Sequence, residues 1–295
     1  MNYREFICAM KEEVRSKAKG ALNVCTHESV KNNGEEKQGI TLVEEGGGIA
    51  PTIYLDGFYA KYKKGVSIEE MAEDILALYQ ETKRQKMWKC ECLASYEAVK
   101  AKITYRVINE KYNEAALKKV PHRLFLDLAV VYYVMLEINE AGTAAMQVNN
   151  EYIEKWGVNE EELYRTAQKN TRVLLKPEFQ SMREVIGSMT GAKENDNNNY
   201  EKDDMYILSN EMKNYGAASI LNESMLEYIR RRIGENYYVI PSSIHEMIIV
   251  GESRSPGKRE LERMICEMNT SQVANDEVLS NRAYYYDGRK RALCI

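Results

Sequence analysis

Long apolar runs are missing from this chain of 295 residues. The longest covers residues 128–136, whereas a helix that spans a bilayer needs about 20 apolar residues. Charged residues also interrupt the apolar positions of residues 1–20, so this segment lacks the continuous hydrophobic region of a secretory signal. The sequence therefore predicts a cytoplasmic protein without a membrane segment.

Cysteine and histidine are scarce as well. Six cysteines and three histidines are too few and too scattered for a disulfide scaffold. Cys90 and Cys92 form a C-x-C pair, but no second pair follows at the spacing of a zinc site. The glycines at 46–48 match neither a Walker loop nor a dinucleotide fingerprint and predict a flexible loop. We therefore expect reduced thiols, no metal site and no cofactor.

Positive charge is not in excess. Lysine and arginine total 41 against 45 aspartates and glutamates, which gives a net charge of −4. This acidic balance argues against nucleic acid as a partner. Basic clusters at 230–232 and 289–291 lie among acidic or aromatic neighbours and are interpreted as solvated surface.

Hydrophobic periodicity predicts an α+β fold of antiparallel hairpins with helices on one face, arranged in recurring strand–strand–helix units. Predicted helices cover residues 1–19, a segment after the capping box of Ser67 and Glu70, and residues 151–156, 159–170, 223–233 and 258–268. Predicted strands cover residues 40–44, 127–138, 143–148, 205–209, 217–221, 237–240 and 247–250. Hairpins are expected within residues 51–62 and 278–295.

One polar stretch suggests how the chain is divided. Residues 191–204 are almost free of apolar side chains, which is typical of a loop or linker. It would separate an N-terminal α+β region, residues 1–190, from a C-terminal α+β region, residues 205–295. One continuous domain is the alternative, and the pattern specifies no oligomeric state.

The densest group of chemically reactive side chains lies between the last two predicted strands before residue 258. It comprises Pro241, Ser242, Ser243, His245 and Glu246. Strand alternation would place Ser243 and His245 on one face and Glu246 on the other. Ser243 and His245 are therefore candidate catalytic residues of a hydrolase, as nucleophile and base.

A structural interpretation of this segment competes with catalysis and is preferred. The sequence contains no G-x-S-x-G elbow and no H-E-x-x-H motif. The hydroxyls and the imidazole would then satisfy backbone groups in a turn between paired strands. In that interpretation residues 241–246 form an ordered, largely buried junction, and Pro241 ends the strand before it.

Tyrosine is abundant, with 21 residues against 4 phenylalanines. Adjacent tyrosines recur at 132–133, 237–238 and 284–286, within predicted strands. Alternation would direct one ring of each pair outward, where it could contact a partner. Tyrosine is also simply a good strand former, which is the competing explanation. Candidate binding residues are Tyr237, Tyr285, Ser242 and Glu246.

Several segments together resemble a known family. They are PTIYLDGFY (51–59), VPHRLFLDLAVVYY (120–133), YILSN (206–210), IPSSIHE (240–246) and EVLSN (277–281). With these motifs the chain resembles an uncharacterised domain family, of unknown function, that is common in gut Firmicutes. The resemblance implies no activity and no catalytic residue.

The absence of a recognisable catalytic motif and the surplus of tyrosine predict a function by binding. We expect a non-enzymatic module that binds another macromolecule, a protein rather than a nucleic acid. A hydrolase centred on Ser243 and His245 is the alternative.

Overall fold

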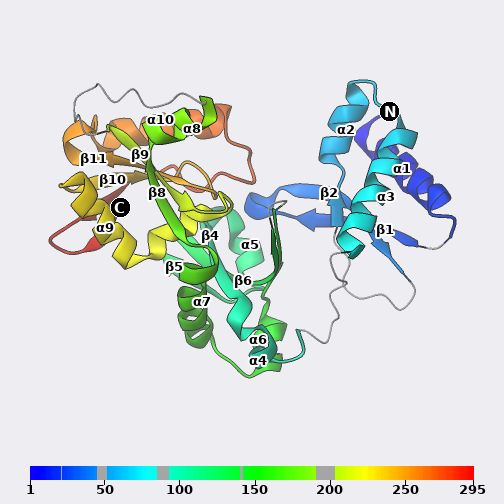
Figure 1. The fold of residues 1–295 in the computed structure, drawn as a ribbon, viewed down its shortest axis with the longest axis horizontal. Coiled ribbons are helices and arrows are strands. Elements are labelled where there is room, and N and C mark those ends of the chain that lie inside the picture. The colour runs from blue at the N-terminus through cyan, green and yellow to red at the C-terminus, as the bar shows by residue number, and fades with distance from the viewer. Residues whose placement is uncertain (21, 45–51, 85–92, 140–141, 191–202) are drawn as a thin grey trace. The chain divides into compact units, whose positions relative to one another are not determined.

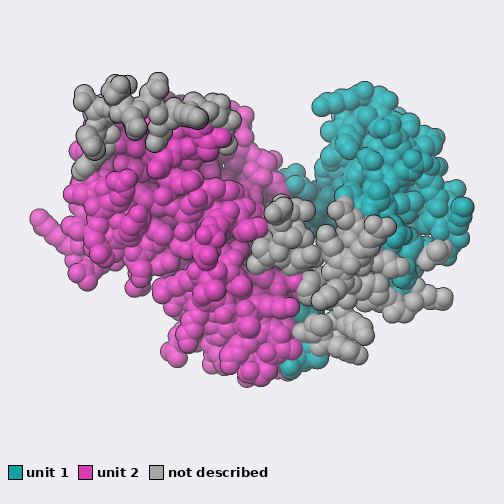
Figure 2. Space-filling model, in the orientation of Figure 1, with its two compact units in different colours: residues 1–95 teal, residues 96–295 magenta. Residues whose placement is uncertain are grey.

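The computed structural model describes residues 1–20, 22–44, 52–84, 93–139, 142–190 and 203–295. They form two compact units, Met1–Ser95 and Tyr96–Ile295 (Figure 2). The predicted loop at 46–48 and the C-x-C pair at 90–92 lie outside the described residues, as do residues 191–202 of the predicted linker. Residues 96–190 and 205–295 both belong to unit 2. The division predicted at 191–204 stays a prediction.

The described residues of unit 1 form three α-helices, the short 3-10 helix η1 (Asn32–Gly34) and a three-stranded antiparallel sheet with the order β1-β2-β3. Its elements are α1 (Tyr3–Lys17), β1 (Asn23–Val30), β2 (Glu36–Val43), β3 (Thr52–Tyr54), α2 (Asp56–Lys63) and α3 (Ile68–Arg84). The predicted capping group of α3 is present, because the Glu70 N–H donates to the Ser67 hydroxyl at 3.2 Å.

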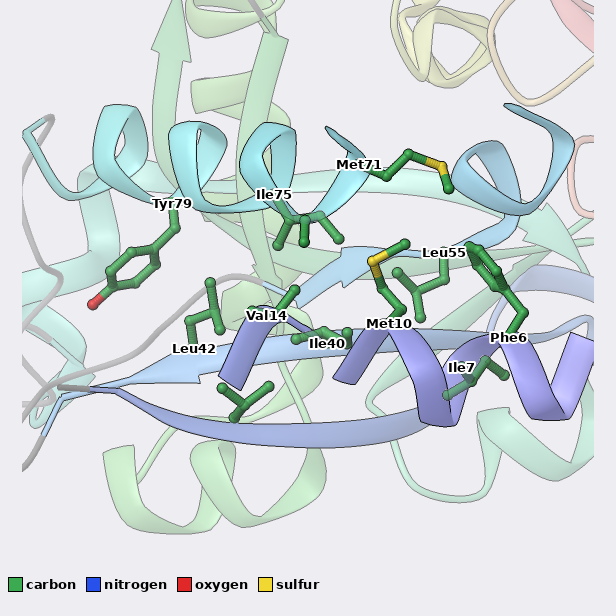
Figure 3. Packing of buried hydrophobic residues seen from close by; sticks show 12 residues of the cluster. Phe6, Ile7, Met10, Val14, Ile40, Leu42, Leu55, Met71, Ile75 and Tyr79 are labelled. Carbon is green, nitrogen blue, oxygen red and sulfur yellow. The ribbon is translucent and has the colours of Figure 1, made fainter. Parts of the chain in front are cut away.

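The core of unit 1 lies between α1, β2 and α3, whose apolar side chains point toward one another (Figure 3). The predicted face of the first helix is confirmed, since its apolar positions are buried. The main buried side chains are Phe6, Ile7, Met10 and Val14 from α1, Ile40 and Leu42 from β2, and Met71, Ile75 and Tyr79 from α3.

The hairpin predicted within residues 51–62 is wrong in its second half. Strand β3 ends at Tyr54, and helix α2 follows from Asp56. The aromatic residues after position 55 recur at helical spacing rather than at strand spacing. The rings of Tyr59 and Tyr62 lie 5.2 and 5.3 Å from the ring of Phe6 in α1, which stabilises the helix by packing.

The strands that the structure describes in unit 2 form two sheets (Figure 1). The first has the order β4-β6-β5, with β7 also paired to β6, and the second has the order β13-β12-β10-β11-β9-β8. All pairs between described strands of unit 2 are antiparallel, as predicted. The strands are β4 (Ile103–Asn109), β5 (His122–Phe125), β6 (Leu128–Asn139), β7 (Gly142–Gln147), β8 (Pro177–Ser181), β9 (Met205–Asn210), β10 (Tyr237–Ile240), β11 (Met247–Gly251), β12 (Tyr284–Asp287) and β13 (Ala292–Cys294).

The helices of unit 2 largely follow the predicted pattern. They are α4 (Tyr96–Val99), α5 (Glu114–Leu117), α6 (Asn150–Trp156), α7 (Glu160–Leu174), α8 (Met182–Thr190), α9 (Glu223–Ile233) and α10 (Lys258–Ser271). The strand predicted at 217–221 is wrong: this segment is a 3-10 helix, η5 (Gly216–Leu221). All six of its residues are buried, and periodicity does not distinguish a short buried helix from a buried strand.

The α+β fold is confirmed, but helices contact both faces of the six-stranded sheet rather than the single face we expected. On one face, α10 packs through Leu261 and Ile265 against the cluster that includes Ile240. On the opposite face, the Tyr237 hydroxyl donates to the carbonyl of Leu226 in α9 at 2.9 Å. Within the described ranges, no helix is both long and apolar enough to cross a membrane.

Candidate functional site

The predicted junction, residues 241–246, connects β10 to β11. Strand β10 ends at Ile240, as Pro241 predicts, because proline has no N–H for the strand ladder. Ser243 closes a tight turn: its hydroxyl accepts the backbone N–H of His245 at 3.0 Å. Its own N–H donates to the carbonyl of Glu246 at 3.3 Å. The local polar groups therefore satisfy the backbone of the turn.

Ile244 ties this junction to two other segments. Its side chain is buried, and its N–H donates to the carbonyl of Glu277 at 2.9 Å. Its carbonyl accepts the N–H of Ala217 at 3.4 Å. The junction therefore holds the segment after α10 and the start of η5 against the β10–β11 connection.

The imidazole of His245 is engaged on both of its nitrogens. Nδ1 accepts the backbone N–H of Tyr215 at 3.1 Å, and Nε2 lies 3.6 Å from Oε1 of Glu277. Because Nδ1 acts as an acceptor, the neutral ring carries its proton on Nε2, next to that carboxylate. The backbone carbonyl of His245 also accepts the Ser209 hydroxyl at 2.8 Å. His245 thus joins three segments, as expected for a structural tie.

Ser243 and His245, the candidate catalytic pair, are close together, but their side chains do not form the hydroxyl–imidazole hydrogen bond that catalysis needs. A nucleophilic hydroxyl must reach its base by a hydrogen bond. In the described part of the chain, the Ser243 hydroxyl bonds the backbone of His245, while the imidazole bonds Tyr215 and approaches Glu277. The catalytic role of the pair stays a prediction, and these contacts give it no support.

The four candidate binding residues differ in their exposure. Tyr237 is fully buried and stacks on Tyr286 at 4.9 Å, so its ring lies in the core, where a partner does not reach it. Tyr285 is half-buried; its hydroxyl accepts from Asn236 at 2.8 Å and donates to Glu252 at 2.9 Å. Ser242 and Glu246 are half-buried in the junction. Alternation does separate the tyrosines as expected, but it directs Tyr237 inward.

An arginine that the sequence analysis did not single out lies beside the junction. The guanidinium carbon of Arg106, in β4, is 4.0 Å from the ring centroid of Tyr133 in β6. It is 3.4 Å from the ring centroid of Tyr215, which in turn lies 5.3 Å from the ring of His245. In the sequence, the tyrosine pair at 132–133 was the only local indication of this cluster, because Arg106 and Tyr215 are far apart in sequence.

Burial raises the pKa of the Tyr133 phenol, although the positive charge of Arg106 opposes the rise. The phenol is therefore neutral at pH 7. Tyr133 consequently offers Arg106 its ring and a neutral hydroxyl oxygen, so the contact combines a cation–π interaction with a side-chain hydrogen bond and is not an ion pair.

Four of the five segments that carry the family resemblance lie in unit 2 and meet there, whereas residues 51–59 belong to unit 1. Ser209 of YILSN bonds His245 of IPSSIHE, and His245 approaches Glu277 of EVLSN. Ser280 of EVLSN donates to the carboxylate of Asp127, in the longest motif, at 2.6 Å. Motifs that are far apart in the sequence therefore form one connected network.

Replacing His245 with alanine should lower the free energy of unfolding by roughly 1–3 kcal/mol, because the N–H of Tyr215 loses its acceptor in a half-buried place. Urea denaturation followed by circular dichroism measures the change. His27→Ala is the control, because His27 is exposed on β1 of unit 1. An unchanged midpoint for His245→Ala would mean that the residue is no structural tie.

Two further observations concern metal binding and the relatives of this chain. No three ligating side chains among the described residues gather in a way that could hold a metal ion. No curated protein and no solved structure matched the chain significantly. A family model matched residues 3–288, nearly the whole chain, in agreement with the resemblance of its motifs. The chain therefore belongs to DUF5688, a family of unknown function.

Proposed function

We propose that this protein is a cytoplasmic, non-enzymatic module that binds another protein through an aromatic surface beside strand β8. The surface consists of Tyr228 and Phe179 above the buried ring of Tyr206, and Tyr228 carries the proposal. Its side chain is 50% exposed, although it packs edge-on against Phe179 at 6.4 Å between ring centroids. Phe179 stacks in turn on the buried ring of Tyr206 at 5.0 Å.

A rigid, half-exposed tyrosine is well suited to a protein interface. Its ring supplies contact area at little entropic cost, because packing already restricts it, and its hydroxyl tolerates water. Tyr238 and Tyr285 are less accessible, since both rings are half-buried against each other at 5.1 Å. Tyr228 is therefore the better anchor for a partner.

The position of β8 indicates the form of the partner. β8 is the last strand in the order of the six-stranded sheet, so its outer edge has no neighbouring strand among the described residues. Such an edge offers N–H and C=O groups to an added strand. We therefore propose that the partner contributes an extended segment that pairs with β8 and contacts Tyr228.

The alternative is a hydrolase with Ser243 and His245 at its centre. It has weaker support, because the hydroxyl of Ser243 and Nδ1 of His245 each bond a backbone N–H. A fluorophosphonate probe should leave Ser243 unlabelled. Labelling that Ser243→Ala abolishes would favour the hydrolase over the binding module.

A photo-crosslinking amino acid at position 228 tests the proposal. In cells of the source organism it should form a covalent adduct with one discrete protein, because position 228 lies at the proposed interface. Position 112 is the matched control: Tyr112 is also in unit 2 and is 45% exposed, but it lies on the 3-10 helix 111–113, apart from β8.

Once the partner is identified, Tyr228→Ala should weaken binding roughly 10-fold or more, as truncated interface tyrosines commonly do. Tyr112→Ala should leave the affinity unchanged. Equal crosslinking from positions 228 and 112, or an unchanged affinity of Tyr228→Ala, would contradict the proposal.

A further inference from the structure

Arg106 carries a positive charge that no carboxylate among the described residues neutralises in an ion pair. It is half-buried on β4, its guanidinium group lies over the rings of Tyr133 and Tyr215, and the Tyr133 hydroxyl oxygen accepts a hydrogen bond from it. An aromatic ring attracts a cation through its face, but it provides no lone pair in the plane of the guanidinium group. A guanidinium group has five N–H donors and the Tyr133 oxygen engages only part of them, so further donors of Arg106 remain for an acceptor.

The other half-buried arginines of the described chain are paired differently. Arg123 bonds the carboxylates of Glu160 and Glu161, and Arg230 lies 3.9 Å from Glu227. No carboxylate among the described residues forms an ion pair with Arg106. A half-buried cation without an anionic partner is uncommon in a folded protein, since desolvation without pairing destabilises it.

A buried hydroxyl without a partner lies next to Arg106. Thr104 is fully buried, and its Oγ1 has no hydrogen-bond partner among the residues that the structure describes. Thr104 precedes Arg106 by two residues on β4, so both side chains lie on the same face of the sheet. Thr104 is also directly opposite Tyr133 in the register of β4 and β6. A hydroxyl and a cation that lack such partners in the described part of the chain therefore lie two positions apart on one face of β4.

The tyrosines also fix the orientation of the guanidinium group. Tyr215 has a positive φ of 53°, and its N–H is bound by His245, so its ring is held on a constrained backbone. Tyr133 is held within the ladder of β6. A guanidinium group held in one plane presents its donors as a fixed fork, which matches two oxygens of one acceptor.

We propose that Arg106 binds the oxyanion of a ligand, a carboxylate or a phosphate, through the edge of its guanidinium group. The hydroxyl of Thr104 is placed to assist at the same face of the sheet. The junction at His245 then has a role in binding, because it positions Tyr215 against Arg106. This site is separate from the surface at Tyr228, so either proposal can fail alone.

The test follows the Nε–H signal of Arg106 by NMR while inorganic phosphate or acetate is added at constant ionic strength, with chloride as the reference salt. The signal should shift to saturation with phosphate, with acetate or with both, and the larger response identifies the preferred oxyanion. Chloride should give only a small, unsaturated change. Tyr228→Ala should leave the response intact.

Variants establish which side chain binds. Arg106→Gln should abolish the saturable stabilisation by the anion in thermal unfolding. Arg106→Lys keeps the charge but lacks the fork, so its affinity should fall roughly 10-fold, which corresponds to about 1.4 kcal/mol. Thr104→Val should weaken binding less than either. Arg259→Gln is the control, because Arg259 is exposed on α10 of the same unit.

Three results would overturn the proposal. One is an Arg106 signal in the wild-type protein that responds to phosphate and acetate no more than to chloride. Another is a saturable response that Arg106→Gln retains. The third is that Arg259→Gln loses as much of the stabilisation by the anion as Arg106→Gln does, which would indicate general attraction of anions to the surface. The wild-type titration decides the outcome even where Arg106→Gln does not fold.

Discussion

Gly216→Ala should lower the free energy of unfolding of unit 2 by roughly 3 kcal/mol, at the upper end of the range for overpacked sites. A Cβ atom at this position would lie 2.6 Å from the backbone nitrogen of Asn210 and 2.7 Å from the backbone oxygen of His245. It would also overlap the hydroxyl of Ser209. Backbone atoms of two segments would have to move, so side-chain rotation does not relieve the clash.

A double variant distinguishes overlap of the new Cβ atom with backbone atoms from its overlap with the Ser209 side chain. Ser209→Ala removes the hydroxyl that the Cβ atom would meet, but the contacts with Asn210 and His245 persist. Gly216→Ala combined with Ser209→Ala should therefore be as unstable as Gly216→Ala alone, or less stable. Gly57→Ala is the control, because nothing lies within 4 Å of a Cβ atom there. Urea denaturation of the four variants measures the effect, and rescue by Ser209→Ala would contradict the argument.

The elements that were predicted correctly are specified by residues at or near their own ends. Helix α9 is bounded by the side chain of Asn222, which accepts the N–H of Met225 at 3.2 Å, and by Gly234 with φ of 87°. Such caps act over a few residues, so sequence alone is sufficient to place them. The same holds for β10 and β11, whose apolar runs flank Pro241.

The errors occurred where tertiary context decides. Residues 217–221 form a 3-10 helix that is buried throughout, and a short apolar run has no periodicity that distinguishes such a helix from a buried strand. Tyr237 points inward because α9 covers its face of the sheet. Strand alternation predicts that neighbouring tyrosines differ in exposure, but not which of them is buried.

The candidate site was predicted only in its local part. Residues 241–246 were recognised as a junction because their polar side chains are consecutive, and the bond from His245 N–H to Ser243 agrees with that interpretation. Arg106 was missed because its contacts with Tyr133 and Tyr215 depend on the pairing of β4 with β6 and on the position of η5. No periodicity in one sequence encodes such distant contacts.

The other large effect is expected at Asp127, in the turn between β5 and β6. Its Oδ2 accepts the Ser280 hydroxyl and its Oδ1 accepts the Tyr284 hydroxyl, each at 2.6 Å. Ser280 and Tyr284 are fully buried, and Tyr284 belongs to the other sheet of unit 2. Burial raises the pKa of the Tyr284 phenol, and the charge of Asp127 raises it further, so the phenol stays a neutral donor.

Asp127→Ala should lower the free energy of unfolding by roughly 2–6 kcal/mol, because two buried hydroxyls lose their acceptor and each such loss costs about 1–3 kcal/mol. Asp127→Asn should cost less, since its amide oxygen still accepts one hydroxyl. Tyr284→Phe removes one donor, so Asp127→Ala should cost less in that background, and the double-mutant cycle should give a coupling of about 1 kcal/mol or more. Glu154→Ala, exposed on α6, is the control and should change stability by less than about 0.5 kcal/mol. Additive losses in the cycle, measured by urea denaturation, would show that Asp127 does not tie the two sheets together through Tyr284.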